Sequence, residues 1–461
     1  MSKWQKVALA DIYDISSGLS KSADSFGSGY PFLSFKEVFA NYFLPDELDQ
    51  LVESSEKERE RCSIKRGDVF LTRTSETMHE LGMSSVALKD YPAATFNGFT
   101  KRLRPKADSQ YKVHPEFIGY CLRSPSFRTS MLAFSTMSTR ASLNNDMISR
   151  LVIQLPPIDI QKHIAKVLKA LDDKIKVNRQ ANQNLEDIAL AIFRSWFIDF
   201  EPTLAKIIAK QAGKDPQKSA MAAISGISLD DLHQLSQEQQ DQLSTIAELF
   251  PDSLVDSELG EIPKGWKIKQ LNEFVRFQNG YAFKSKDWKE EGIPVVKIGS
   301  VKPGLVELNN CSYVTPDTVA DLARFKLNPG DLLVGMSGYP GETGLVPISD
   351  SAPYLNQRVG KVLPKDELKY GWLYCVLRNS SFKSYAESRA HGSAQANVSG
   401  KALMEFPVIF ASEKLLEFLH IAVSPLISKY LNGAYESERL ELIRNHLLAR
   451  LLTGKLKTVT D

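Results

Sequence analysis

The chain has 461 residues, of which 43% are hydrophobic and 24% charged, and its formal net charge is +2. That length exceeds what one hydrophobic core usually fills, so several domains are expected. No apolar run is long enough to span a bilayer and no stretch resembles a signal peptide, which predicts a cytoplasmic protein with no membrane contact.

Cysteine and histidine usage argues against a metal site. The four cysteines, Cys62, Cys121, Cys311 and Cys375, show no CxxC spacing, and the seven histidines are scattered. Cys121 and Cys375 occupy equivalent places in apolar segments, which is typical of buried free thiols. We therefore expect neither a disulfide nor bound zinc.

A long-period repeat divides the chain into two similar copies. Matches persist along both copies, while the stretches between them differ in length and sequence. The matched pairs include Trp4/Trp266, Leu9/Leu271, Gly18/Gly280, Asp68/Asp331, Asn97/Asn356, Pro105/Pro364 and Arg123/Arg378. This pattern indicates one scaffold that presents two different sets of loops, as expected of two copies that bind two different things.

Within each copy, short β-branched and aromatic runs bounded by Gly and Pro predict strands. The expected strands are 68–73, 85–89 and 99–104 in the first copy, and 294–299, 331–335 and 358–363 in the second. A helix at 115–133 and its counterpart at 370–388 follow. Each copy is thus predicted to be a mixed α+β unit that closes with one long helix.

The strongest helix signal runs from about residue 159 to 200, where apolar residues recur in alternating steps of four and three. This heptad seam comprises Ile164, Leu168, Leu171, Ile175, Asn178, Asn182, Leu185, Ala189, Ile192 and Trp196. A second seam lies 255 positions later, at Leu419, Val423, Leu426, Tyr430, Gly433, Ser437, Leu440, Arg444, Leu447 and Leu451.

Two such stripes at equivalent places predict two helices that pair with each other, whereas a single stripe would more often face a separate core. Both seams carry polar or small residues in the same two central layers, Asn178 with Gly433 and Asn182 with Ser437. Asn in a seam costs stability but fixes the register of the helices.

Residues 201–262 separate the two copies and carry four lysines against eleven acidic residues. A polar helical segment is expected near 229–249, followed by turn residues from Pro251 to Gly265. This composition indicates an acidic connector rather than a further domain. The rest of the chain is therefore modestly basic, which permits nucleic-acid binding.

At this point the sequence resembles the specificity subunit (S, or HsdS) of type I restriction-modification enzymes over essentially its whole length. The resemblance is carried by the two-copy layout and by three motifs. The motifs are Leu155-Pro156-Pro157-Ile158 with Gln161, the run Phe193-Arg194-Ser195-Trp196-Phe197-Ile198-Asp199-Phe200, and the linker from Leu249 to Trp266. The second helix departs from the pattern, because it follows 406–411 without a Pro-Pro pair or a matching Gln.

The resemblance implies an α+β fold in which two mixed α/β target-recognition domains are separated by a pair of long antiparallel coiled-coil helices, with a pseudo-two-fold repeat. The expected domains are 1–157 and 263–410, with helices at 158–200 and 411–457 and the linker at 201–262. Each domain would read one half of a bipartite site in double-stranded DNA. The chain itself would be a non-catalytic subunit that recruits two methyltransferase (M) subunits and restriction (R) subunits, with S-adenosylmethionine, ATP and Mg on those partners.

The paired helices would then set the spacer between the half-sites. Half-sites about one helical turn apart, ~34–36 Å, face the same side of a duplex. A helix of roughly 37 residues spans about 55 Å. A flexible linker would not discriminate between spacer lengths.

Candidate DNA-contacting residues lie in loops that combine hydrogen-bond donors with glycine or small residues. Arg suits guanine and Asn or Gln suits adenine, whereas Lys mostly meets phosphate. In the first copy the candidates are Lys21, Arg73, Thr74, Ser75, Asn97, Lys101, Arg140 and Asn144. In the second they are Asn279, Tyr281, Lys284, Ser337, Tyr339, Asn356, Gln357, Arg358, Ser393, Gln395 and Asn397.

Two other functions match the sequence less well. Pro251-Asp252 with Glu261 and Lys264 resembles a nuclease motif, but the Glu-to-Lys spacing is one residue too long and the segment is the acidic connector. No nucleotide-binding Gly-x4-Gly-Lys-Ser/Thr loop is present. The alternative from another class is a coiled-coil scaffold whose two globular units bind protein partners, and salt-dependent DNA binding would separate the two.

Overall fold

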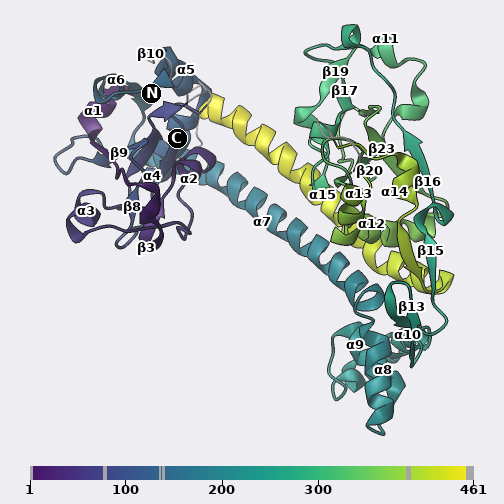
Figure 1. Ribbon diagram of the computed structural model, residues 1–461. Helices are drawn as coiled ribbons and strands as arrows, with labels where there is room; N and C mark the ends of the chain where they lie inside the picture. Colours follow the sequence, from purple (N-terminus) through teal and green to yellow (C-terminus); the bar gives the residue numbers. More distant parts are fainter. Residues whose placement is uncertain (1–3, 76–79, 134–135, 138–140, 391–395, 453–461) are drawn as a thin grey trace. The chain divides into compact units, whose positions relative to one another are not determined.

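The computed structural model describes residues 4–75, 80–133, 136–137, 141–390 and 396–452. The chain divides into two compact units, Met1–Lys176 with Glu438–Asp461 and Val177–Ser437. Two long helices, α7 (Ile158–Phe197) and α15 (Glu413–Leu451), contribute residues to both units (Figure 1).

The first unit is built on an antiparallel sheet in the order β2-β9-β5-β7. These strands are β2 (Tyr13–Ser17), β9 (Thr100–Pro105), β5 (Val69–Thr72) and β7 (Ser84–Val86). Strand β1 (Gln5–Ala8) pairs with β12 (Val152–Leu155), so the first and last strands of this copy lie side by side just before α7 begins. Two small sheets contain β4 (Leu51–Val52), β3 (Phe26–Leu33) and β8 (Thr95–Phe96), and β10 (Thr136–Met137), β11 (Ala141–Ser142) and β6 (Thr74–Ser75). The shorter helices are α1 (Leu9–Ile12), α2 (Phe35–Ala40), α3 (Glu56–Arg61), α4 (Pro115–Arg123), α5 (Pro125–Ala133) and α6 (Asn145–Ser149).

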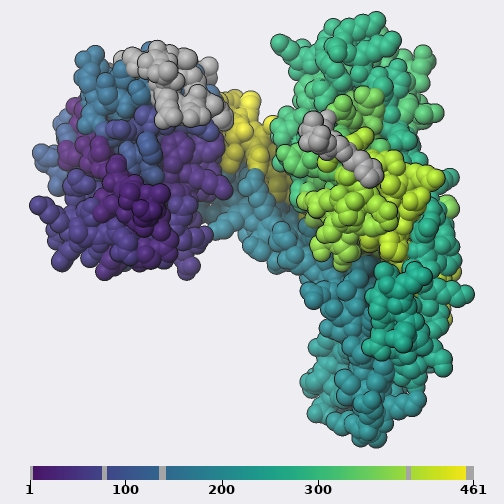
Figure 2. Space-filling model, viewed as in Figure 1, coloured from purple at the N-terminus to yellow at the C-terminus, as the bar shows by residue number. Residues whose placement is uncertain are grey.

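The second unit repeats this plan in the order β16-β23-β20-β21 and adds β18 parallel to β21. These strands are β16 (Val275–Asn279), β23 (Val359–Pro364), β20 (Leu332–Gly335), β21 (Thr343–Leu345) and β18 (Gly304–Leu305). The strand pair that precedes the long helix is β15 (Lys267–Gln270) with β24 (Pro407–Phe410), and a small sheet holds β19 (Ser312–Val314), β17 (Ile293–Val296) and β22 (Tyr354–Leu355). The helices are α11 (Pro316–Val319), α12 (Tyr370–Arg378), α13 (Ser380–Ser388) and α14 (Gly400–Met404). Segments far apart in the sequence, coloured teal, green and yellow, share the surface of this unit (Figure 2).

Each of the six strands expected from the sequence overlaps an observed strand, but the two expected helices at 115–133 and 370–388 are each broken in the middle. The break falls at Ser124 in the first copy, where Pro125 restricts the preceding residue to an extended conformation. In the second copy it falls at Asn379, whose side-chain oxygen accepts the Ser381 N–H at 2.9 Å and so starts α13. Buried apolar residues lie on both sides of each break, Leu122 with Phe127 and Leu377 with Phe382, so the apolar pattern alone did not mark the breaks.

Residues 201–262 form more structure than their polar composition indicates. They contain α8 (Glu201–Gln211), α9 (Pro216–Ser225), α10 (Gln237–Glu248) and the hairpin β13 (Leu254–Ser257)/β14 (Gly260–Pro263). A small cluster of buried residues, Ala220, Met221, Leu232 and Ala247, lies among the helices. The helix expected from 229 begins only at Gln237, because Ser236 and Gln239 form a reciprocal capping box there.

In the first unit α7 packs against α15 and against the rest of the first copy. Ile164 and Leu168 of α7 share one buried cluster with Leu448 and Leu451 of α15 and with Tyr120 of α4. Beside this cluster, the Arg444 guanidinium lies 2.5 Å from the Asp172 carboxylate, which also accepts the Tyr120 hydroxyl at 2.6 Å. Burial and this carboxylate both raise the pKa of Tyr120.

In the second unit the same two helices meet through other residues. Asn178 donates to the Glu436 carboxylate at 2.7 Å, and a Cβ at Gly433 would lie 2.5 Å from the Asn182 side-chain oxygen. As the residue number rises from 178 to 182 along α7, the residue number of the partner falls from 436 to 433 along α15. The two helices are therefore antiparallel here. The sequence repeat pairs Asn178 with Gly433 and Asn182 with Ser437. These residues occupy equivalent places in the two helices, but they are not the residues that contact each other across the helix pair.

Replacing Asp172 with Ala should lower the free energy of unfolding by about 1.5–3 kcal/mol, the range for hydrogen bonds to charged groups. The reason is that Arg444 and the Tyr120 hydroxyl would both lose a partly buried partner. Urea denaturation measures the change. Asp173→Ala is the matched control, because Asp173 is exposed and pairs with Lys169 one turn away in the same helix. Equal losses for the two variants would contradict this account.

Candidate nucleic-acid interface

Four loop segments of the first unit converge at one end of its main sheet. Strands β2 and β5 end there and β9 begins there, because Ser17 lies opposite Lys101 and Thr72 opposite Thr100. Main-chain hydrogen bonds then join the segments that follow. They run from the N–H of Leu19 to the Phe96 carbonyl (2.8 Å), from Gly98 to Leu19 (2.8 Å), from Arg73 to Phe99 (2.9 Å) and from Leu143 to Arg73 (2.8 Å). We call this arrangement the loop frame.

The second unit contains the same loop frame at the equivalent end of its sheet. Each bond of the first frame has a counterpart between residues at matching places in the repeat. They run from the N–H of Tyr281 to the Leu355 carbonyl (2.9 Å), from Gln357 to Tyr281 (2.9 Å), from Met336 to Arg358 (3.1 Å) and from Val398 to Met336 (2.8 Å). The two copies therefore share a backbone arrangement and not only a fold.

One glycine in each frame is fixed by close packing. A Cβ atom at Gly18 would collide with the carbonyl oxygen of Asn97, and one at Gly280 would collide with that of Asn356. These glycines match in the repeat. No other residue fits without a shift of the backbone that carries the loops.

The side chains on the two frames differ at equal positions. Arg73 in the first frame corresponds to Met336 in the second, and Phe99 corresponds to Arg358. Phe99 is 57% exposed, and Gln357 and Arg358 are exposed as well. The first frame thus exposes an aromatic side chain, whereas the second frame exposes hydrogen-bonding side chains.

Several residues predicted to bind DNA in the first copy serve the frame itself. Asn97 accepts the Phe99 N–H through its side chain at 2.7 Å, and Asn144 caps α6 by accepting the Met147 N–H at 2.8 Å. Thr74 and Ser75 form β6, which pairs with β11. Arg140 lies outside the described residues.

The three predicted cations of this copy that the structure describes have different surroundings. Lys21 pairs with Glu58 at 2.8 Å. Lys101 is buried and donates to the Ser17 hydroxyl at 2.8 Å, and burial together with the positive charge of Arg73 lowers the pKa of Lys101. The Arg73 Nε has no hydrogen-bond partner among the described residues. Lys101 and Arg73 thus form a pair of neighbouring positive charges at the frame.

Most of the predicted residues of the second copy that the structure describes are exposed. Those that are exposed are Asn279, Lys284, Tyr339, Gln357, Arg358 and Asn397. Tyr281 is half-buried, with its ring 5.0 Å from Phe283 and 5.4 Å from Phe325. Ser337 and Asn356 are buried, so their side chains shape the frame rather than its surface. Ser393 and Gln395 lie outside the described residues.

Phe99 was not among the residues predicted from the sequence. The sequence offers one indication of its importance: Phe99 lies between Gly98 and the strand that starts at Thr100, at the place that Arg358 occupies in the second copy. Because Phe is usually buried, composition alone favours a core position for it. Only its location on the frame reveals a surface role.

The predicted seam residues lie on the inner faces of the long helices. Those that are buried are Ile164, Leu168, Ile175, Asn178, Leu419 and Val423, and those that are half-buried are Leu171, Asn182, Leu185, Leu426, Tyr430, Leu440 and Leu447. Large apolar residues also remain exposed on these helices, namely Val177, Ile188 and Ile421 in the second unit and Leu442 and Ile443 in the first.

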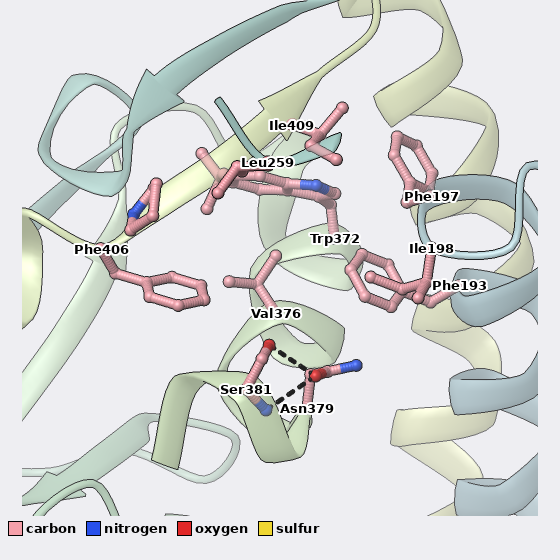
Figure 3. A pocket seen from close by; sticks show the side chains of 12 residues that line it. Phe193, Phe197, Ile198, Leu259, Trp372, Val376, Asn379, Ser381, Phe406 and Ile409 are labelled. Carbon is pink, nitrogen blue, oxygen red and sulfur yellow. Dashed lines mark hydrogen bonds between the residues drawn. The ribbon is translucent and has the colours of Figure 1, made fainter. Parts of the chain in front are cut away.

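An apolar hollow of about 190 Å³ lies in the second unit, where the end of α7 meets α12 and β24 (Figure 3). Phe193, Phe197, Trp372 and Phe406 line it, and its polar members Asn379 and Ser381 bond to each other. None of its twelve lining residues can titrate near neutral pH, so it offers no group for acid-base chemistry.

Metal-ligand clusters and membrane-spanning helices are both absent from the described residues. Among residues 4–452 outside the gaps, no three His, Cys, Asp or Glu side chains are grouped to hold a metal ion. Within the same residues, no helix has both the length and the apolar character needed to cross a membrane.

Comparison with known proteins gives consistent matches. A family model described as the type I restriction modification DNA specificity domain matches residues 1–187 and 263–412. The chain is 28% identical to the type I restriction enzyme HindI specificity subunit of Haemophilus influenzae, with 99% of this chain and 100% of the relative covered. It is 23% identical to the MjaIX specificity subunit of Methanocaldococcus jannaschii, with 98% and 94% covered.

A solved structure has the same fold. The S subunit of a type I restriction-modification system from M. genitalium matches with a TM-score of 0.51 at 14% identity, and 98% of this chain and 96% of that chain are covered. At this identity the match concerns the mixed helix-and-strand fold alone.

Replacing Gly280 with Ala should destabilise the second unit by about 1–3 kcal/mol, the usual cost of overpacking, because the new methyl group meets main chain. Denaturant unfolding measures this cost. Gly299→Ala is the control, since a Cβ there has nothing within 4 Å. If both variants unfolded alike, the close approach at Gly280 would not constrain the frame.

Proposed function

The chain belongs to the type I restriction modification DNA specificity family, and from this we propose that it reads a bipartite site in double-stranded DNA with one half-site per recognition domain. Membership makes it a DNA sequence-recognition subunit. The finer assignment rests on one observation: the loop frame occurs twice, with the same main-chain bonds and different side chains. Two readers of one design with different surface groups suit two different half-sites.

The side chains on each frame have the chemistry that base and phosphate contacts need. Exposed Arg358 and Gln357 suit bidentate bonds to guanine and adenine. In the first domain, the half-buried Arg73, beside the buried positive charge of Lys101, suits a phosphate, which positions the protein without reading sequence. The exposed ring of Phe99 can contact a thymine methyl group or a sugar.

The paired helices are proposed to set the spacer between the half-sites. Helix α7 has 40 residues and α15 has 39, so each is about 60 Å long at 1.5 Å per residue. A continuous helix is stiff, which supports a fixed separation better than a flexible linker would.

The catalytic work is proposed to reside on partner subunits. Two methyltransferase subunits and the restriction subunits would bind this chain, and S-adenosylmethionine, ATP and Mg would be held there. The exposed apolar side chains on the long helices, such as Ile188 and Ile421, support a partner surface on them. This assembly would act in the cytoplasm, on cellular and incoming DNA.

Arg358→Ala should change only the half-site read by the second domain. Loss of a bidentate base contact costs about 1–3 kcal/mol of discrimination at one base pair. The measurement is a map of methylated bases in DNA from cells that carry the complete system. Arg276→Ala is the control, because Arg276 is an exposed arginine within β16 and not on the frame. A simultaneous change in both half-sites would refute independent readers.

DNA binding should be weak for the chain alone and should strengthen when the methyltransferase subunits are added. In each case the logarithm of the binding constant should fall with the logarithm of salt concentration, by about 0.9 for each phosphate contact. Titrations of a labelled duplex at several salt concentrations test this. A scaffold for protein partners would show no such dependence, and equal affinity with and without the partners would also count against the proposal.

A further inference from the structure

A buried carboxylate of α7 holds the second recognition domain within the second unit. Glu186 is only 9% exposed. Its Oε1 accepts the Tyr374 hydroxyl at 3.1 Å and the Arg378 Nε at 2.8 Å, and a second guanidinium nitrogen of Arg378 lies 2.8 Å away. Tyr374 and Arg378 both belong to α12, so one carboxylate receives two side chains of the same short helix.

Other elements of the second unit meet at the same point. Arg378 also donates to the Thr343 carbonyl in β21 at 3.2 Å, which ties the main sheet to the cluster. At Gly304 in β18, a Cβ would lie 2.6 Å from the Tyr430 hydroxyl of α15 and 3.7 Å from Glu186. The two long helices, α12 and the sheet therefore converge on Glu186.

The first unit attaches its domain by a related but different contact. Tyr120, which matches Tyr374, donates to Asp172 of α7 at 2.6 Å. Arg123, which matches Arg378, instead donates to main-chain carbonyls, including those of Ser84 at 2.6 Å and Asn41 at 2.7 Å. Of these two matched arginines, Arg378 thus bonds to the long helix, whereas the Arg123 bonds named here stay within its own domain.

We propose that Glu186 is a positioning residue, which fixes the orientation of the second recognition domain on the paired helices and thereby limits the spacer lengths that the complex accepts. This inference rests on the proposed function. Two nitrogens of the planar guanidinium and the Tyr374 hydroxyl all meet one carboxylate oxygen, and three such contacts limit rotation more than apolar packing alone does. A domain that could rotate on the helices would reach half-sites one base pair nearer or farther.

The test uses the complete methyltransferase assembly and duplexes that carry both half-sites at the natural spacing, one base pair shorter and one base pair longer. For Glu186→Ala, the preference in methylation rate for the natural spacing should fall by about tenfold or more, while the bases read in each half-site stay the same. Asp187→Asn is the matched control, because Asp187 is the next residue of α7, is exposed and accepts a bond from Gln183 of the same helix. It should keep the full preference.

Two further variants separate positioning from stability. Arg378→Lys keeps the charge but loses the planar fork and should give an intermediate preference, and Tyr374→Phe removes a single hydroxyl. If Glu186→Ala does not fold, these two variants decide the question. Folded variants with lowered melting temperature and an unchanged spacing preference would overturn the positioning role. If the unmodified assembly methylated no bipartite site at all, the proposed function would fail instead.

Discussion

The hydrophobic seam of α7 must be buried along its length. The elements that cover it also attach both recognition copies to the helix. In the first unit the seam is covered by α15 and by α4, through Leu448 and Tyr120. In the second unit it is covered by α15 and by α12, through Val423 and Trp372. A short helix of each copy is therefore part of the core that the long helices form. The recognition loops are carried by domains that share a hydrophobic core with the helices.

The strand pairs β1/β12 and β15/β24 complete this attachment. Each joins the first strand of a copy to its last, directly before the long helix begins. Each copy therefore begins and ends in one strand pair. Its frame loops follow other strands, which are β2 and β5 in the first copy and β16 and β20 in the second. Changes in the loops leave the base untouched, which is how one frame can carry Phe99 in one copy and Arg358 in the other.

Much of this arrangement could be predicted from the sequence because its causes are local or periodic. The heptad spacing from Ile164 onward predicts a paired helix, and Gly18 with Gly280 marks the loops of the frame. The burial of Cys121 and Cys375 follows from their apolar segments, whereas the burial of polar loop residues could not be predicted, since it depends on neighbours from distant segments. Lys and Ser are residue types that usually lie on the surface, yet Lys101 and Ser337 are both buried. The same cause explains the buried cluster of Ala220, Met221, Leu232 and Ala247 around α9 and α10.

The repeat also fails to predict the contacts that hold each copy to α7. Position 186 corresponds in the repeat to Glu441 of α15, but both Tyr120 and Tyr374 find their carboxylates on α7, at Asp172 and Glu186. Both copies have the tyrosine at the same place. Its carboxylate partner lies on the copy's own long helix in the first copy, but on the long helix of the other copy in the second. The two copies thus share the loop frame and differ in how they attach to the long helices. The attachment of a copy therefore depends on the position of the acidic residue of α7 that accepts its tyrosine hydroxyl, whatever side chains its loops carry.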